Sequence, residues 1–194
     1  MKRACFIFLS VSLLVCLAGS VSAQDPTGEM VEWPYVGADQ AASKYSPLAD
    51  INTANVDQLE IAWTWEPNEL PNQEFRTRPG SFEATPLMID NVIYISTMYT
   101  RVVALDANTG QELWAFDPEA YRTGPRGAGP GGFKHRGVAV WEDGDEMRIF
   151  INSRDSLYSI DVASGTLIPS FGQDGRVILT EDFPNEVTRD EFDQ

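Results

Sequence analysis

Two charged residues occupy corresponding places in this sequence, each just before a short apolar run. Glu83 precedes "ATPLMI", and Arg136 precedes "GVAVW". A long polar loop leads up to each of them, and long loops in a compact fold commonly carry function. The planar fork of an arginine grips a carboxylate, and an acid beside it can contact the same polar ligand. The pair therefore predicts a site for a carboxylate-bearing ligand, with two ordinary surface charges as the alternative.

The chain lacks the residues that several other kinds of catalytic or metal site need. The chain has one histidine, His135, and its two cysteines, Cys5 and Cys16, lie near the start. Zinc sites need several His or Cys ligands, and no Ser-His-Asp arrangement has its usual supporting sequence. The glycines at 124–132 are not followed by a helix, which a phosphate-binding loop requires. The residues therefore support neither a zinc site nor a Ser-His-Asp triad within this chain, and we assign it no metal ligand or catalytic residue on these grounds.

One phrase occurs twice and gives the main signal for the fold. The phrase "ALDANTGQELW" at 104–114 recurs as "SIDVASGTLIP" at 159–169. In each copy an Asp can accept hydrogen bonds from the next backbone amides, and a Gly can take the positive φ that closes a hairpin. Runs rich in Val, Ile, Tyr and Phe precede both copies, as expected for strands.

Each repeat contains four such runs, which predicts an all-β fold. Four-stranded antiparallel units that recur at about 40 to 55 residues are typical of β-propeller blades. An ordinary meander with a coincidental turn is the alternative. The expected strands of the two blades lie at 85–89, 92–97, 101–106, 111–116, 137–141, 147–152, 156–161 and 166–168, and a further strand is expected at 58–65, belonging to the blade that closes the ring.

The length suggests that the propeller is incomplete. The chain has 194 residues, whereas four blades, the fewest that close a ring, would need about 220 residues at this period. Two blades alone would leave strand edges unpaired. We therefore expect an N-terminal fragment that covers about the first two blades.

The first 23 residues have the features of a cleaved signal peptide. Lys2 and Arg3 precede an apolar run, and the small residues Val21 and Ala23 stand at the positions that signal peptidase prefers. We expect residues 1–23 to be removed and residues 24–194 to be exported to the periplasm or beyond. A lipid anchor at Cys16 is the alternative, although Val15 is bulky for such a site.

Charge argues against nucleic acid as a partner. The chain carries 29 acidic and 14 basic residues, a net charge of −15 at pH 7. Such a surface repels a phosphate backbone. The acidic residues are spread over turns and loops, which indicates solvation of the surface rather than a docking patch.

Several stretches carry a resemblance to a known family. The segments "WPYVGADQAASKYSPLADINTANVDQLEIAWTW", "FEATPLMIDNVIYISTMYTRVVALDANTGQELWAFDP", "HRGVAVW" and "FGQDGRV" resemble the N-terminal part of dehydrogenases that depend on pyrroloquinoline quinone (PQQ), above all the membrane-glucose-dehydrogenase-like members and their relatives. The resemblance implies an eight-bladed propeller with PQQ and Ca²⁺ on its axis. It also implies that Trp114 packs between blades, although the second copy has Pro169 in the place of that Trp.

The resemblance assigns roles to the two charged residues. Glu83 matches the acid that contacts the quinone, and Arg136 matches the arginine that pairs with a cofactor carboxylate. Methanol and ethanol dehydrogenases of the family have adjacent cysteines where this chain has Pro130 and Gly131. The disulfide that covers their quinone is therefore missing, which favours a sugar, polyol or other-alcohol branch. We expect His135 to be packed or solvent-facing rather than to touch the cofactor.

The implied activity is oxidation of an alcohol or sugar hydroxyl, with electrons passed to cytochrome c or ubiquinone. The catalytic aspartate and most Ca²⁺ ligands would then lie beyond residue 194. A different class of protein remains open: propellers built from similar repeats also serve as non-enzymatic scaffolds of outer-membrane assembly, which bind protein partners and use no quinone. A complete chain with a channel-facing Asp would favour the enzyme.

Overall fold

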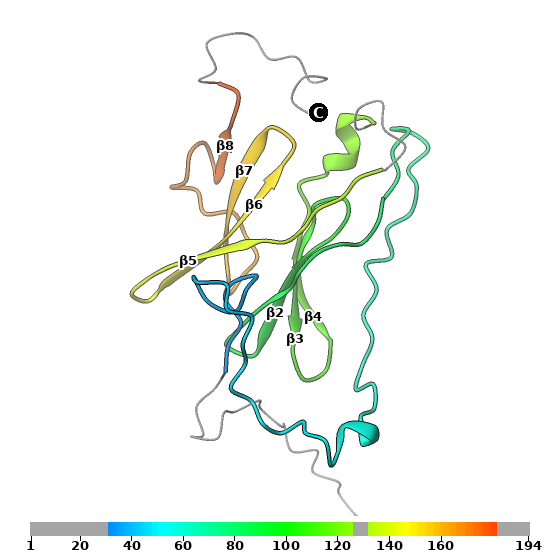
Figure 1. Ribbon diagram of the computed structural model, residues 1–194. Helices are drawn as coiled ribbons and strands as arrows, with labels where there is room; N and C mark the ends of the chain where they lie inside the picture. The colour runs from blue at the N-terminus through cyan, green and yellow to red at the C-terminus, as the bar shows by residue number, and fades with distance from the viewer. Residues whose placement is uncertain (1–30, 126–131, 182–194) are drawn as a thin grey trace, which may run out of the picture.

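The computed structural model describes residues 31–125 and 132–181, which form two four-stranded antiparallel sheets and two short 3-10 helices (Figure 1). In each sheet the strands lie in the order in which they follow along the chain. The first sheet consists of β1 (Leu87–Ile89), β2 (Val92–Ser96), β3 (Val102–Asp106) and β4 (Glu112–Phe116). The second consists of β5 (Ala139–Asp143), β6 (Glu146–Ser153), β7 (Ser156–Asp161) and β8 (Arg176–Ile178), and the helices are η1 (Val56–Gln58) and η2 (Ala120–Thr123).

The repeated Asp-Gly turns form as the sequence predicts. Asp106 accepts hydrogen bonds on Oδ1 from the backbone N–H and the hydroxyl of Thr109, both at 2.8 Å. Gly110 then takes a φ of 69° and donates its N–H to the carbonyl of Asp106 at 2.8 Å. In the second copy Asp161 accepts the backbone N–H of Ser164 at 2.8 Å. Because these hydrogen bonds favour the charged carboxylate, they lower the pKa of both aspartates.

The main core lies between the two sheets. Residues two apart along a strand point to the same face of the sheet. This spacing buries Leu87, Ile89, Val102 and Ala104 of the first sheet. It also buries Ile149 and Ile151 of the second. A second cluster buries the opposite face of β3, where Val103 and Leu105 pack against Trp63 and Trp65. β3 is therefore covered on both faces, as expected for a strand within stacked sheets.

Trp114 joins the first sheet to the second. Its indole N–H donates to the carbonyl oxygen of Val162 at 3.0 Å, in the turn between β7 and the following segment. The indole also covers Gly165 so closely that a Cβ at that position would lie 2.5 Å from the ring. The prediction that Trp114 packs against the neighbouring sheet is confirmed.

Trp63 makes the same contact one sheet earlier. Its indole N–H donates to the carbonyl oxygen of Ala107 at 3.1 Å, and a Cβ at Gly110 would lie 2.5 Å from its ring. Ala107 and Gly110 hold the places in the first turn that Val162 and Gly165 hold in the second. The segment around Trp63 therefore packs on the first sheet as β4 packs on the second.

Seven of the eight predicted blade strands are confirmed, six with shifted ends and the strand at 156–161 with the predicted ends, and the eighth is wrong. The strand expected at 166–168 is reduced to one bridge, between Leu167 and Ile160. Pro169 cannot donate a ladder hydrogen bond, and the chain turns away there through Gly172 and Gly175, both with positive φ. It returns as β8, which pairs with Ser156–Tyr158.

The strand expected at 58–65 is also wrong. Residues 56–58 form η1, and no strand is assigned to residues 59–71. A strand is defined by ladder hydrogen bonds to a neighbour, and within the described part of the chain this stretch has no such ladder. In Figure 1 it runs as extended chain along one side of the first sheet.

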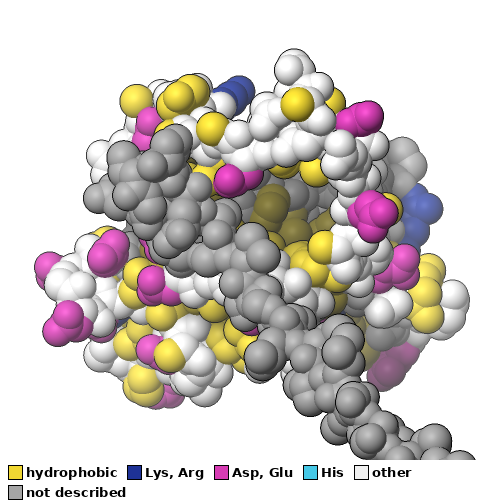
Figure 2. All heavy atoms as spheres, turned by 90° about the horizontal axis from the view of Figure 1, so that it is seen from below, with side chains coloured by type: hydrophobic (Ala, Val, Ile, Leu, Met, Phe, Trp, Pro, Cys, Tyr) yellow, Lys and Arg dark blue, Asp and Glu magenta, His cyan; other side chains and the backbone are white. Residues whose placement is uncertain are grey.

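Acidic side chains are spread over the surface. Figure 2 shows them scattered around the viewed face, with apolar side chains deep in a central hollow. This distribution agrees with solvation of the surface. Among the described residues, none of the helices has the length and apolar character needed to cross a membrane. The expected signal peptide at 1–23 lies outside those residues.

We predict that Trp114→Ala lowers the free energy of unfolding by about 3 kcal/mol, because it removes both the buried ring surface and the hydrogen bond to Val162. Trp114→Phe keeps most of the ring and should cost only about 1 to 2 kcal/mol. Denaturant titration of the purified protein measures both values. Equal stability of Trp114→Ala and the wild type would contradict the docking role.

We also predict that Gly165→Ala is more destabilising than Gly144→Ala. Both glycines have positive φ, at 69° and 61°, so both substitutions strain the backbone. Only a Cβ at Gly165 meets the Trp114 ring, whereas a Cβ at Gly144 meets nothing within 4 Å. The steric clash should add about 1 to 3 kcal/mol to the cost at Gly165. The same denaturation midpoint for the two variants would contradict the predicted clash with Trp114.

Candidate cofactor site

The two segments that lead into β1 and β5 lie side by side. Phe133 donates its N–H to the carbonyl of Arg78 at 2.9 Å, and its own carbonyl accepts the N–H of Gly80 at 2.7 Å. Farther along, Thr85 donates its N–H to the carbonyl of Arg136 at 3.0 Å. The residues just before β1 and β5 thus use their backbone groups to hydrogen-bond to each other and not to the neighbouring strands of their own sheets. Both strands therefore begin two residues later than the sequence predicts. We call 78–85 and 132–137 the lead-in segments.

Phe133 anchors the second lead-in segment. Only 3% of its surface is exposed, and its ring meets the Tyr99 ring edge to face with centroids 5.1 Å apart. The Arg154 guanidinium lies 4.4 Å from the centroid of the same ring, a distance suited to a cation–π interaction. The residues that follow Phe133 therefore start from a fixed point.

Glu83 and Arg136, which the sequence predicts to contact one shared ligand, form an ion pair with each other, and a third charge joins them. Arg136 Nη2 lies 3.2 Å from Glu83 Oε2, and Lys134 Nζ lies 2.9 Å from Glu83 Oε1. Each carboxylate oxygen thus has its own cation. The hydrogen bond and charge of Lys134, followed by the charge of Arg136, lower the pKa of Glu83. We call Glu83, Lys134 and Arg136 the charge trio.

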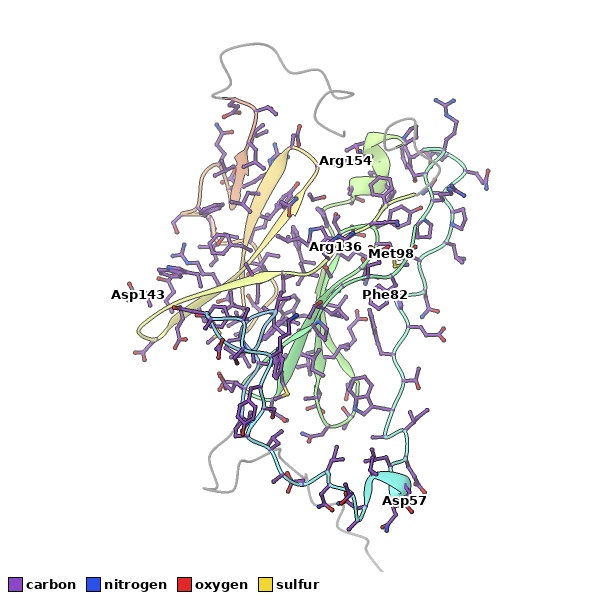
Figure 3. All side chains as sticks on the ribbon, viewed as in Figure 1. Asp57, Phe82, Met98, Arg136, Asp143 and Arg154 are labelled. Carbon is purple, nitrogen blue, oxygen red and sulfur yellow. The ribbon has the colours of Figure 1, made fainter. Side chains whose placement is uncertain are left out.

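Exposure differs strongly within the charge trio. The side chain of Arg136 is 83% exposed, whereas those of Lys134 and Glu83 are 37% and 28% exposed. Arg136 projects from the place where the second lead-in segment passes the first sheet (Figure 3). Its guanidinium can therefore bind an incoming anion while its backbone stays fixed by Thr85.

Sequence reasoning missed Lys134. A signal was present, because "FKHR" places Lys134 and Arg136 two residues apart, and in extended chain such residues point to the same side. His135, between them, points elsewhere: its Nδ1 lies 2.9 Å from Ser96 Oγ and its Nε2 lies 3.3 Å from Asn152 Oδ1. His135 is thus half-buried and contacts β2 of the first sheet and β6 of the second. Pro130 and Gly131 lie outside the described residues.

A hollow of about 410 Å³ lies apart from the charge trio, beside the end of β4. It is lined by Glu69, Tyr99, Arg101 and neighbouring residues, with no member of the trio among them. The Glu69 carboxylate accepts hydrogen bonds from the Thr97 hydroxyl and the Tyr99 N–H, and burial raises its pKa. This acid holds the β2–β3 turn. Across residues 31–125 and 132–181, no three His, Cys, Asp or Glu side chains gather where they could hold a metal ion.

Known proteins resemble this chain both in sequence and in the arrangement of the sheets. The chain is 36% identical over 136 residues to quinohemoprotein alcohol dehydrogenase of Comamonas testosteroni, an alignment that covers 69% of this chain and 17% of that protein. It is 31% identical over 179 residues to 1-butanol dehydrogenase (cytochrome c) of Thauera butanivorans, covering 90% and 22%. It is 30% identical over 192 residues to quinoprotein glucose dehydrogenase of Escherichia coli, covering 86% and 23%.

The crystal structure of the Comamonas testosteroni enzyme superposes with a TM-score of 0.59 and 30% identity, over 78% of this chain and 20% of that one. The two four-stranded sheets are therefore part of a β-propeller, and this chain spans about a fifth of the length of the relatives it matches. The family model for the glucose/ethanol/alcohol dehydrogenase β-propeller domain matches residues 33–193. The chain belongs to the family of PQQ-dependent glucose, ethanol and alcohol dehydrogenases.

Proposed function

We propose that the full-length protein is a dehydrogenase that uses PQQ to oxidise the CH–OH group of an alcohol, polyol or sugar. Family membership supports the reaction type. The relatives include an alcohol, a butanol and a glucose dehydrogenase, so their names do not narrow the substrate class further. Because Pro130 and Gly131 replace the paired cysteines, the proposal favours these substrates over methanol.

The observation that carries the proposal is the exposed guanidinium of Arg136. It lies at the head of β5, 83% exposed, with Glu83 as a partner at 3.2 Å. PQQ is a small anion with several carboxylates, and a planar guanidinium binds a carboxylate through two parallel N–H donors. The residues present therefore fit this cofactor. The packed Phe133 and the backbone bond to Thr85 hold the segment that presents Arg136.

In this proposal the chain's own residues bind and orient the cofactor. Arg136 takes a cofactor carboxylate, and Glu83 fixes the guanidinium by occupying one side of it. Bound PQQ supplies the oxidising power, accepting the two electrons and the hydrogen that leave the substrate carbon. Ca²⁺ would polarise the quinone as a Lewis acid. We place the aspartate that removes the hydroxyl proton, and most of the Ca²⁺ ligands, beyond residue 194.

We further propose that the protein is exported and works in the periplasm. The basic and apolar start of the chain, with Val21 and Ala23 before the cleavage point, supports a signal peptide at residues 1–23. The proposed electron acceptor is cytochrome c or ubiquinone. The name of the Thauera butanivorans relative, which includes cytochrome c, supports the first of these.

A non-enzymatic scaffold for outer-membrane assembly is the competing function. It would use the same kind of propeller but would have no need of an exposed arginine at the head of β5. Family membership favours the dehydrogenase. Binding of PQQ separates the two, because only the dehydrogenase requires it.

We predict that Arg136→Ala weakens PQQ binding by roughly 10- to 150-fold, because it removes a charge-assisted interaction of about 1.5 to 3 kcal/mol. Arg136→Lys should recover only part of this loss, since an ammonium keeps the charge but lacks the planar fork. The measurement is a titration of the full-length apoprotein with PQQ at fixed Ca²⁺, followed by dye-linked oxidation of alcohols and sugars.

Two results would contradict the proposal at different levels. Equal PQQ affinity of the wild type and Arg136→Ala would remove the cofactor role from Arg136 alone. A wild-type protein that binds no PQQ would remove the dehydrogenase function and favour the scaffold.

A further inference from the structure

Lys134 neutralises Glu83 from the side opposite Arg136. Its Nζ donates a hydrogen bond to Glu83 Oε1 at 2.9 Å, while Arg136 reaches Oε2 at 3.2 Å. The hydrogen bond and the charge of Lys134 each lower the pKa of Glu83 more than the charge of Arg136 does. Lys134 is therefore the principal counter-ion of Glu83, and Arg136 is the secondary one.

The local backbone enforces this arrangement. Lys134 and Arg136 are two residues apart in the extended lead-in segment, so both side chains leave it on the same side. His135 leaves on the other side and bridges Ser96 and Asn152. Phe133, buried at 3% exposure, fixes the start of the segment. Both cations thus reach one carboxylate without competing for the same oxygen.

The charge trio has a simple electrostatic consequence. Two cations and one carboxylate leave a single net positive charge beside the head of β5. Without Lys134, Arg136 and Glu83 would form a neutral pair, and an incoming carboxylate would have to compete with Glu83 for the guanidinium. The protein already repels an anion, because its net charge is −15 at pH 7. Competition with Glu83 for the guanidinium would weaken the binding of that anion further.

We propose that Lys134 is a positioning residue for the cofactor, which holds Glu83 so that Arg136 is available to a carboxylate of PQQ. This inference rests on the proposed function. Lys134 acts through Glu83 and is not itself a contact of the cofactor. Its contribution should be smaller than that of Arg136, because all three side chains are partly open to solvent and their interactions are screened.

The test is a double-mutant cycle on the full-length apoprotein, read by calorimetric titration with PQQ at fixed Ca²⁺. Lys134→Met keeps the length of the side chain and removes its charge, and it should weaken PQQ binding by about 3- to 10-fold. Lys134→Arg restores a cation and should bring the affinity back to within about 2-fold of the wild type. In a Glu83→Gln background, Lys134→Met should change the affinity by less than about 2-fold, because the Glu83 carboxylate through which Lys134 acts is gone.

A matched control removes the same charge elsewhere. Lys44 is exposed and lies outside the charge trio, and Lys44→Met should leave the PQQ affinity unchanged at moderate salt. Thermal unfolding of each variant verifies that the protein is folded, and the KM for the alcohol should be the same in Lys134→Met as in the wild type.

The outcomes separate this role from its alternatives. An unchanged affinity of Lys134→Met would overturn it, and so would an equal loss in both the wild-type and the Glu83→Gln backgrounds, which would indicate a direct contact with PQQ. Failure of Lys134→Arg to recover binding would also overturn it. A wild type that binds no PQQ would remove the proposed function, and the role of Lys134 with it.

Discussion

The packing of one indole ring on the turn of the next sheet is the contact on which the rest of this structure depends. Trp63 covers Gly110 and bonds to Ala107, and Trp114 covers Gly165 and bonds to Val162. The hydrogen bond of the indole N–H sets the direction from which the ring approaches the turn. The glycine of the turn has no Cβ, which lets the ring come into close contact with the backbone. The Trp114 contact fixes the spacing of the two sheets, and the Trp63 contact fixes the extended chain on the first sheet in the same way.

That spacing decides where the lead-in segments lie. With the sheets face to face over a core that includes Leu87 and Ile149, the two segments come close enough to exchange backbone hydrogen bonds. Thr85 and Arg136 form one of these bonds at 3.0 Å. A shift between the sheets would break it and separate the charge trio. Stability of the sheet packing and geometry of the site are therefore coupled.

In the proposed function, the charge trio lets an acidic protein attract an anionic cofactor. The net charge is −15 at pH 7 and acidic side chains are scattered over the surface, so the long-range field repels an anion. Binding must then rely on short-range contacts, where two cations around one carboxylate leave a local positive charge. This demand makes the second cation, Lys134, a functional part of the proposed site.

The sequence by itself determined the local elements, because these depend on neighbouring residues: the Asp106 and Asp161 turns, seven blade strands, and Glu83 and Arg136 as a candidate pair. Family resemblance supplied the packing of Trp114. Tertiary structure alone decided three features. A ladder needs a partner strand, so 58–65 is no strand and the fourth strand of the second sheet falls after Gly175. Lys134 contacts Glu83 only because the two lead-in segments pack together. The sequence of one segment does not indicate which residues of the other segment will lie beside it.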